Sequence, residues 1–392
     1  MNDYMEQLKT QVPAGAWDYL PAECAAKRKV EDEIRDSFLK NGYSEIETPS
    51  FEYYEVFMHD SVPYVQENMM KFFDQKGRIL ALRPDLTGPI ARAAATKLLI
   101  RQDVLRLCYI QNAFGFFNRG IAGKTEFTQA GVELIGKQGA DADAEVIALA
   151  IGTLRKIGLE GFKIELGQVA YFKGLIEGSG LDEEQTERIR ALVDAKNNVE
   201  LEYELSRLNM EGPKKQALLE LGSLFGGREA LVKAEMLAKS EECRRAVENI
   251  REVFDILCGF GYEEYLSIDF GILNNFNYYS GIIFRGISDG IGTPILSGGR
   301  YDELLSEFGT DAPATGFAMG IKELLVVLER QGKLVSTSEK TMVVLAPREM
   351  LGQAFAYVQE LRKQGKRVVL ELNGSSYDPA KFEVVDFQRR IK

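Results

Sequence analysis

Polar and apolar side chains alternate along residues 125–136, TEFTQAGVELIG. If the segment is a strand, its side chains point to opposite faces in turn. One face then carries Phe127, Gln129, Gly131 and Glu133, and the other carries Thr128, Ala130, Val132 and Leu134. An amide and a carboxylate beside a glycine gap suit a small cationic or zwitterionic ligand lying on a sheet. Taken alone, the segment favours the plainer alternative, a solvent-facing polar side of an antiparallel strand.

A second polar cluster lies in RPDLTG, at a junction between a predicted strand and a predicted helix. The carboxylate of Asp85 can bind an α-amino group, and the hydroxyl of Thr87 can donate or accept beside it. Both residue types also cap helix N-termini, and Thr87 fits the N-cap of a helix with Pro89 in its first turn. Taken alone, this segment favours capping.

Common catalytic motifs are absent. The sequence has no GxxxxGKS or GxxxxGKT phosphate loop and no nucleophile elbow, and GSGLDE at 178–183 lacks the third glycine of a dinucleotide turn. His59, the single histidine, has no obvious partner and is interpreted as structural or surface. The four cysteines form no CxxC pair, so we expect free thiols and no Cys/His metal site.

Size and charge set broader limits. The chain has 392 residues, which leaves room for two or three domains with a substantial core. A formal charge of −11 gives no general basic field for nucleic acid. The first residues, MNDYMEQLKT, lack the apolar region of a secretory signal, and no run of about 18 apolar residues occurs. We therefore expect a soluble, cytoplasmic protein without a membrane span.

The elements around these clusters predict an α+β fold. A helix over 21–40 ends at Asn41-Gly42, and an extended segment with Pro49 at a strand edge or bulge follows. Hairpin-connected strands with helices grouped around them indicate an antiparallel sheet. The predicted strands are 78–85, 104–114, 125–136, 162–172, 265–273 and 278–287, and the predicted helices are 87–100, 142–158 and 316–333. We expect a core over 1–330 with a helical insertion at about 173–256, and a small truncated α/β unit of βαβ form over 338–392.

Five motifs give a specific resemblance. RPDLT, EFTQAGVE, NYYSG, GGRYDELL and PATGFAMGIKEL occur in the order and rough spacing of histidyl-tRNA synthetases, and the resemblance covers about residues 10–330. It implies a class II aminoacyl-tRNA synthetase-like sheet, with Pro49 in the dimer-forming first motif. By this resemblance, the residues that hold the ammonium group and backbone end of histidine are Asp85, Thr87 and Gln129, and those around the imidazole are Glu133, Tyr278 and Tyr279.

The departures from that family fall on the residues that should bind ATP. Gly115 and Phe117 stand where the family has an Arg and a Glu, and Asn274 and Asn277 stand where it has an Arg and an Asp. Glu323 replaces the Arg that meets the γ-phosphate. A carboxylate repels a triphosphate, and activation of an amino acid depends on cations that offset developing charge. Arg300 survives in GGRYD, but it can simply support the glycine-rich turn.

A histidine pocket without nucleotide-binding cations resembles the regulatory subunits of ATP phosphoribosyltransferase, which are paralogues of histidyl-tRNA synthetase. The resemblance implies a non-catalytic homodimer that binds a separate short-form catalytic subunit as a hetero-oligomer in the first step of histidine biosynthesis. It also implies feedback regulation by histidine, without a cofactor, metal or tRNA. The main alternative is a histidyl-tRNA synthetase with divergent motifs, and a third is a binding protein that uses the scaffold for another ligand.

Overall fold

The computed structural model describes residues 9–58, 67–117, 124–273, 278–334, 340–372, 377–378 and 382–391. His59, Asn274 and Asn277 lie outside the described residues. The chain forms two compact units. The larger comprises Met1–Tyr19 with Lys27–Leu334, and the smaller comprises Leu20–Ala26 with Val335–Lys392.

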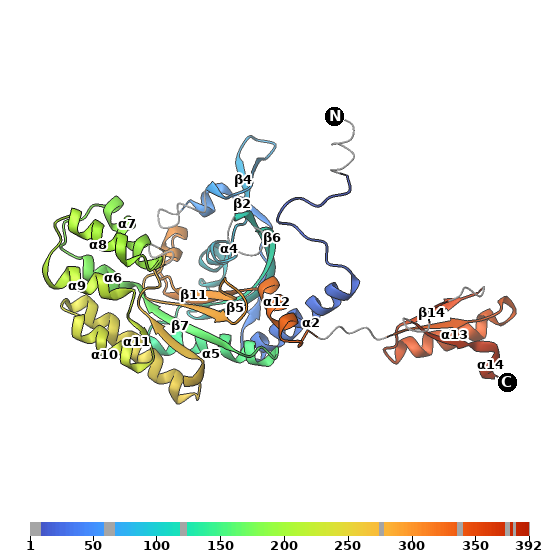
Figure 1. Cartoon of the computed structure of the whole chain (residues 1–392). Coiled ribbons are helices and arrows are strands. Elements are labelled where there is room, and N and C mark those ends of the chain that lie inside the picture. Colours follow the sequence, from blue (N-terminus) through green and yellow to red (C-terminus); the bar gives the residue numbers. More distant parts are fainter. Residues whose placement is uncertain are drawn as a thin grey trace. The chain divides into compact units, whose positions relative to one another are not determined.

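The larger unit is built on a nine-stranded sheet with the order β1-β5-β6-β12-β11-β10-β7-β9-β8. Figure 1 labels β5, β6, β7 and β11 of this sheet. Its neighbouring strands are antiparallel except in two pairs, β1 with β5 and β7 with β9. The strands are β1 Ser44–Glu45, β5 Leu105–Phe117, β6 Lys124–Ile135, β7 Phe162–Gln168, β8 Phe225–Gly226, β9 Leu266–Asp269, β10 Ile282–Ser288, β11 Leu296–Arg300 and β12 Ala314–Gly320. The predicted antiparallel α+β architecture is confirmed.

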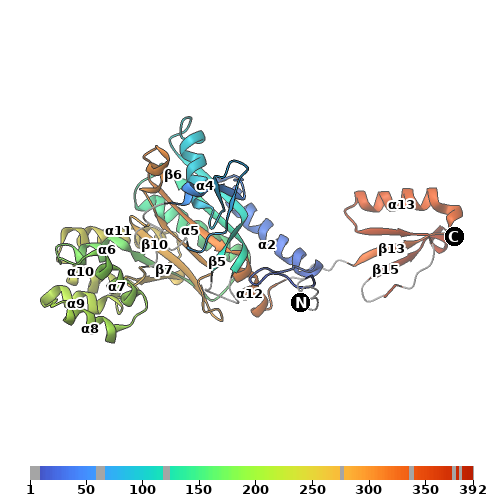
Figure 2. The same ribbon diagram turned by 90° about the horizontal axis from the view of Figure 1, so that it is seen from above.

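One face of this sheet packs against long helices. Ala130, Val132 and Leu134 of β6 are buried here among apolar residues of α2, α5 and α11, as the alternation along β6 predicted. These helices are α2 Pro21–Lys40, α5 Ala140–Lys156 and α11 Glu241–Gly259. Figure 2 shows α5 and α11 beside the strands. Gln129 and Glu133 therefore lie on the opposite face of the sheet, away from these helices.

Short helices cover one end of that opposite face. Leu105, Leu107 and Tyr109 of β5 pack there with apolar residues of α4 Thr87–Ala93 and the 3-10 helix η4 Leu304–Phe308. The helix predicted over 87–100 is confirmed only in its first part, because α4 continues as a π-helix, η2 Ala94–Leu98. A second small sheet, in the order β2-β4-β3, leads into α4, with β2 Phe51–Tyr53, β3 Lys71–Phe73 and β4 Ile79–Leu82.

Helices dominate the chain between β7 and β9. They are α6 Val169–Ile176, α7 Glu183–Asp194, α8 Asn198–Arg207, α9 Gly212–Leu221 and α10 Arg228–Leu237, followed by α11. The strand predicted over 162–172 is wrong after Gln168, whose side chain caps α6 by accepting from the Ala170 amide at 3.3 Å. The two-residue strand β8 inside this block was not predicted, and it pairs with β9 at the sheet edge. The larger unit closes with α12 Ile321–Arg330.

The smaller unit is a three-stranded parallel sheet with the order β14-β13-β15. Its strands are β13 Thr341–Leu345, β14 Val368–Glu371 and β15 Phe382–Asp386, and its helices are α13 Leu351–Lys363 and α14 Phe387–Ile391. Val344, Ala354 and Phe387 share one small core. Among the described residues, no helix is both long and apolar enough to span a membrane.

Candidate functional site

The predicted ligand residues come from three separate parts of the chain. Glu133 is on β6 and is only 2% exposed, so the alternative of a solvent-facing polar side is wrong at this position. Thr87 begins α4, and its side chain hydrogen-bonds to the Glu133 carboxyl. Asp85 lies close enough for its charge to act on Glu133 and on Tyr278, which precedes β10. The fold thus brings these side chains into one buried polar cluster.

Stacked tyrosines form the wall of this cluster. The Tyr278 ring stacks on Tyr301, with centroids 5.4 Å apart and 19° between the planes, and meets Tyr279 edge-on at 5.0 Å. The Tyr301 hydroxyl hydrogen-bonds to the Glu133 carboxyl. The Tyr109 hydroxyl interacts with Thr87. Sequence reasoning assigned no role to Tyr109 or Tyr301, although Tyr301 stands inside the GGRYD motif.

The glycine gap beside Glu133 is already filled. A Cβ added to Gly131 would collide with the Tyr109 hydroxyl, so this glycine makes room for a tyrosine and not for ligand. Gly316 on the neighbouring strand has a similar role, because a Cβ there would collide with the Glu133 carboxylate. The two glycines therefore let the side chains of Tyr109 and Glu133 pack closely against the backbone of the sheet.

We predict that Gly316→Ala destabilises the fold by about 1–3 kcal/mol, because a well-packed site must shift to accept one extra carbon. Gly292→Ala is the control, since a Cβ at Gly292 meets nothing within 4 Å. The free energy of unfolding in urea measures both changes. Equal stability of the two variants would contradict the close packing of Glu133 and the Val132 carbonyl against Gly316.

Thr87 does not cap α4, which corrects the capping expectation. The helix begins at Thr87 itself, and Leu86 occupies the N-cap position with helical φ and ψ values of −103° and −21°. Asp85 takes the capping role instead, since its Oδ1 accepts from the Gly88 amide at 3.3 Å. The Thr87 hydroxyl is therefore available to interact with Glu133, Tyr109 and Tyr278. Asp85 therefore both caps the helix and adds negative charge to the pocket.

Gln129 lies on the same sheet face as Glu133, four residues earlier along β6. Its Oε1 atom is buried and has no hydrogen-bond partner among the described residues. Its cross-strand neighbour Gln111 is engaged elsewhere, since it accepts from Arg83 at 2.6 Å and donates to the Ile46 carbonyl at 2.8 Å. Buried polar atoms normally have partners. An acceptor in this position suits a donor group on a ligand.

Burial controls the protonation of the cluster. It raises the pKa of Glu133 to about 8; hydrogen bonds from Tyr301 and Thr87 oppose this shift, and the Asp85 charge adds to it. Burial, together with the nearby Glu133 charge, also holds the pKa values of Tyr109, Tyr278 and Tyr301 well above the usual range. The ligand-free pocket therefore holds neutral tyrosines and, at pH 7, a mostly protonated carboxyl group.

This shift predicts a pH-dependent stability. Between pH 4.5 and about 8 the folded chain keeps a proton on Glu133 that the unfolded chain has lost, so stability falls as pH rises. We expect wild type to lose up to about 1.4 kcal/mol per pH unit relative to Glu133→Gln in this window. Urea unfolding of both proteins at pH 6, 7 and 8 tests the prediction, and parallel pH profiles would contradict it.

The positions expected to bind a nucleotide carry no cation where the structure describes them. Gly115 is buried on β5, and Glu323 lies in the first turn of α12 with only 3% exposure. A Cβ on Gly320 would collide with the Glu323 carboxylate. The Phe117 side chain, like Asn274 and Asn277, is not among the parts of the chain that the structure describes. A buried carboxylate thus stands at the position expected to face a phosphate.

Known proteins with similar sequences identify the family of this chain. The family model for histidyl-tRNA synthetase matches residues 15–324. The ATP phosphoribosyltransferase regulatory subunit of Acetivibrio thermocellus is 44% identical over 96% of this chain and 90% of its own length. This chain belongs to that family. The regulatory subunit of Ruminiclostridium cellulolyticum is 41% identical with the same two coverages.

Solved structures give the same family and fold. A Bacillus halodurans protein described as an ATP phosphoribosyltransferase regulatory subunit/histidyl-tRNA synthetase is 34% identical, with a TM-score of 0.86 over 96% of this chain and 97% of that one. Histidyl-tRNA synthetase from Nostoc sp. PCC 7120 is 22% identical, with a TM-score of 0.78 over 93% of this chain and 86% of that one. The second likeness shows a shared fold. The regulatory-subunit family therefore uses the synthetase scaffold.

Proposed function

We propose that this chain is the histidine-sensing regulatory subunit of an ATP phosphoribosyltransferase whose catalytic subunit is a separate, short-form chain. Membership of the regulatory-subunit family gives the chain its role in histidine biosynthesis. The observation that supports histidine sensing is the pocket itself, in which Glu133 lies against Tyr301 and Thr87, and the Gln129 acceptor on the same sheet face has no partner among the described residues.

Histidine matches the groups of this pocket. An imidazole offers one N–H donor and one acceptor nitrogen when neutral. Glu133 can donate to the acceptor nitrogen while protonated, or accept from the N–H once ionised, and the Tyr278 hydroxyl can serve the other ring nitrogen. Asp85 and Gln129 would accept from the ammonium group, with Thr87 beside them. We propose these residues and Tyr279 as the histidine site.

Electrostatics argues against amino-acid activation in the same site. A triphosphate carries several negative charges, and a buried carboxylate at Glu323 would repel it in a low-dielectric environment. Gly115 offers no side chain to hold a phosphate. Arg300 does not compensate, because its guanidinium is paired with Asp143 at 2.9 Å and with Asp302 at 3.1 Å. We therefore propose histidine binding without catalysis by this chain.

The isolated chain is expected to bind histidine selectively without activating it. Isothermal titration with histidine and with other amino acids measures binding, and histidine-dependent pyrophosphate exchange measures activation. Glu323→Arg should not create exchange activity, because several cationic groups must act together. Exchange at the rate of a synthetase would establish the alternative, a divergent histidyl-tRNA synthetase. Equal binding of unrelated amino acids would favour a scaffold that serves another ligand.

We further propose that the chain self-associates as a homodimer in the cytoplasm and does not bind tRNA. The small sheet supports self-association, since Phe51, Tyr53 and Phe72 leave 49%, 43% and 39% of their surfaces exposed. Phe51 and Phe72 meet edge-on with centroids 5.7 Å apart, so they form a contiguous apolar face. Such faces on soluble proteins mark interaction sites. The formal charge of −11 gives no general attraction for tRNA.

A further inference from the structure

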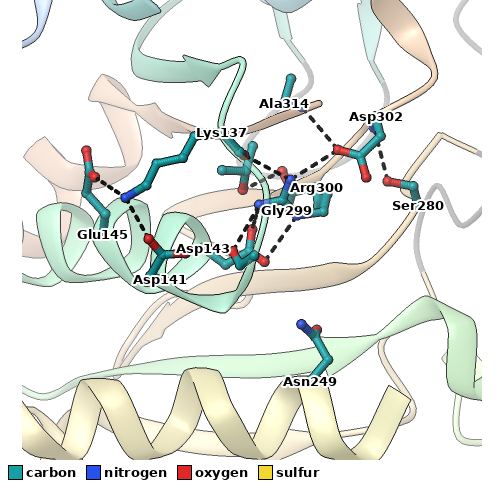
Figure 3. Close-up of polar contacts among 12 residues, drawn as sticks. Lys137, Asp141, Asp143, Glu145, Asn249, Ser280, Gly299, Arg300, Asp302 and Ala314 are labelled. Atoms are coloured by element: carbon teal, nitrogen blue, oxygen red, sulfur yellow. Dashed lines mark hydrogen bonds and ion pairs between the residues drawn. The ribbon is translucent and has the colours of Figure 1, made fainter. Parts of the chain in front are cut away.

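A largely buried ionic cluster centres on Arg300, next to Tyr301 in the sequence (Figure 3). Arg300, at the end of β11, donates from Nε to Asp143 Oδ2 at 3.2 Å and holds Asp143 Oδ1 at 2.9 Å from Nη2. Its Nη1 donates to Asp302 at 3.1 Å. Arg300 also reaches the Lys137 and Gly139 carbonyls, both at 3.4 Å. The guanidinium therefore ties the end of β11 to the N-terminal end of α5.

Asp143 and Arg300 are only 1% and 8% exposed, and neither belongs to the proposed histidine contacts. Burial would lower the pKa of Arg300, but the charges of Asp143 and Asp302 outweigh it and raise the pKa. Burial raises the pKa of Asp143, against the Arg300 charge. Such a pair is costly to bury, so simple stability is a weak explanation for it.

Tyr301 directly follows β11 and stands between two anchored residues, Arg300 and Asp302. Its amide donates to the Ala314 carbonyl at 2.8 Å, and the Ala314 amide donates to Asp302 Oδ1 at 3.1 Å. Asp302 therefore joins β12 to Arg300 through one carboxylate oxygen. Because Arg300 and Asp302 are both held in place, the Tyr301 side chain is directed toward Glu133 on β6.

Ser280 joins the second tyrosine segment to the same cluster. Its amide donates to the Arg300 carbonyl at 2.8 Å, and its Oγ accepts from the Asp302 amide at 3.0 Å. Tyr278 and Tyr279 directly precede it in sequence. The two segments that supply the tyrosine wall are therefore joined at Ser280, close to the stack of Tyr278 on Tyr301.

We propose that Arg300, Asp302 and Ser280 are positioning residues of the histidine pocket, which hold Tyr301 and Tyr278 in place without touching the ligand. The histidine part of this inference rests on the proposed function. The alternative is that Arg300 only neutralises Asp143. That alternative accounts for the ion pair, but it assigns no role to the bonds between Ser280 and the residues that flank Tyr301.

The sharpest variant is Ser280→Ala, which removes one acceptor and leaves the ion pair intact. Loss of a single hydrogen bond typically weakens binding by about 2- to 12-fold. We expect a drop of that size in histidine affinity by calorimetry, with an unchanged melting temperature. Ser306→Ala is the matched control, because the Ser306 hydroxyl bonds only the Glu303 carbonyl at an exposed position. Equal affinities of Ser280→Ala and wild type would contradict the positioning role.

The double variant Arg300→Met with Asp143→Asn separates positioning from neutralisation, since it leaves no lone buried charge. If Arg300 only neutralises Asp143, this variant recovers both the stability and the histidine affinity that Arg300→Met alone loses. If Arg300 positions the wall, stability recovers and histidine affinity stays about tenfold or more below wild type, the loss expected for a bond to a charged group. Recovery of both properties would overturn the proposal for Arg300.

A ligand-free measurement separates this inference from the histidine assignment. The infrared carbonyl band of the protonated Glu133 carboxyl, identified by its loss in Glu133→Gln, reports the contact with Tyr301. Displacement of Tyr301 in Ser280→Ala should shift this band and raise the pH at which it disappears. If the band shifts in Ser280→Ala but wild type does not bind histidine, the positioning role is supported and the assignment of histidine as the ligand is rejected. An unchanged band in Ser280→Ala and in the double variant would reject the positioning role itself.

Discussion

A short-form ATP phosphoribosyltransferase subunit that is inactive alone should become active when this chain is added. The expectation follows from membership of the regulatory-subunit family and from a pocket whose described residues provide no cation at the phosphate positions 115 and 323. Because the regulatory chain supplies no catalytic group, it must act by favouring an active state of its partner. We expect phosphoribosyl transfer to rise from background to steady turnover and to saturate as this chain is titrated.

Size-exclusion chromatography with light scattering, followed by the forward reaction assay, tests this expectation. One peak that contains both chains, together with restored turnover, supports the assignment. Two separate peaks with unchanged turnover would reject it. Glu323→Arg is a suitable control for residual nucleotide binding by this chain, since it should not alter activation if the partner alone handles ATP.

Glu133→Gln is expected to weaken histidine binding by about 10- to 100-fold. The substitution keeps the shape of the side chain but removes both the ionisable proton and the charge that best accepts an imidazole N–H. Loss of a hydrogen bond to a charged group typically costs about 1.5–3 kcal/mol, which corresponds to that range. The effect should be large because Glu133 is buried among Tyr301, Thr87 and Tyr278, where water cannot replace the lost partner.

Calorimetry or the melting temperature in saturating histidine measures this loss. At a hundredfold excess over Kd a ligand stabilises the folded state by about 2.7 kcal/mol, so the shift is measurable for wild type. Glu126→Gln is the matched control, because Glu126 is an exposed carboxylate on the opposite face of β6 that bonds Asn112. Equal histidine affinity of wild type and Glu133→Gln would place the ligand elsewhere, even within the same family.

Alternation along β6 predicted the layout of the sheet at this site. It placed Ala130 and Val132 on one face and Gln129 and Glu133 on the other, and the structure agrees, with Ala130 and Val132 in the core. This succeeded because the period of a strand is fixed by backbone geometry. The prediction of a gap at Gly131 was wrong, because the side chain that fills it comes from the neighbouring strand, and pairing register is not visible in one strand.

Tyr109 and Tyr301 were missed for the same physical reason, because the pairing of strands far apart in the sequence brings them to Glu133. Tyr109 faces Glu133 because β5 pairs with β6 in one register, and Tyr301 reaches Glu133 because β11, which it follows, is joined to β6 through β12. The segment around Thr87, taken alone, favoured capping, and only the family resemblance placed Thr87 in the pocket; the position of its hydroxyl relative to the tyrosines depends on tertiary packing. The strand expected over 162–172 ended at Gln168, since a local cap outweighed the apolar run that follows. Long-range contacts decided the tyrosine positions, and a local cap decided the end of the strand at Gln168.

The buried carboxylate of Glu323 has a consequence for the signal that such a subunit would carry. A synthetase site responds to both of its substrates, so its occupancy varies with the energy charge of the cell as well as with amino-acid supply. With a buried acidic side chain and no cation at position 323, the proposed pocket would bind one metabolite only. Its output would then report the end product of the pathway, undisturbed by swings in the nucleotide pool that the partner consumes.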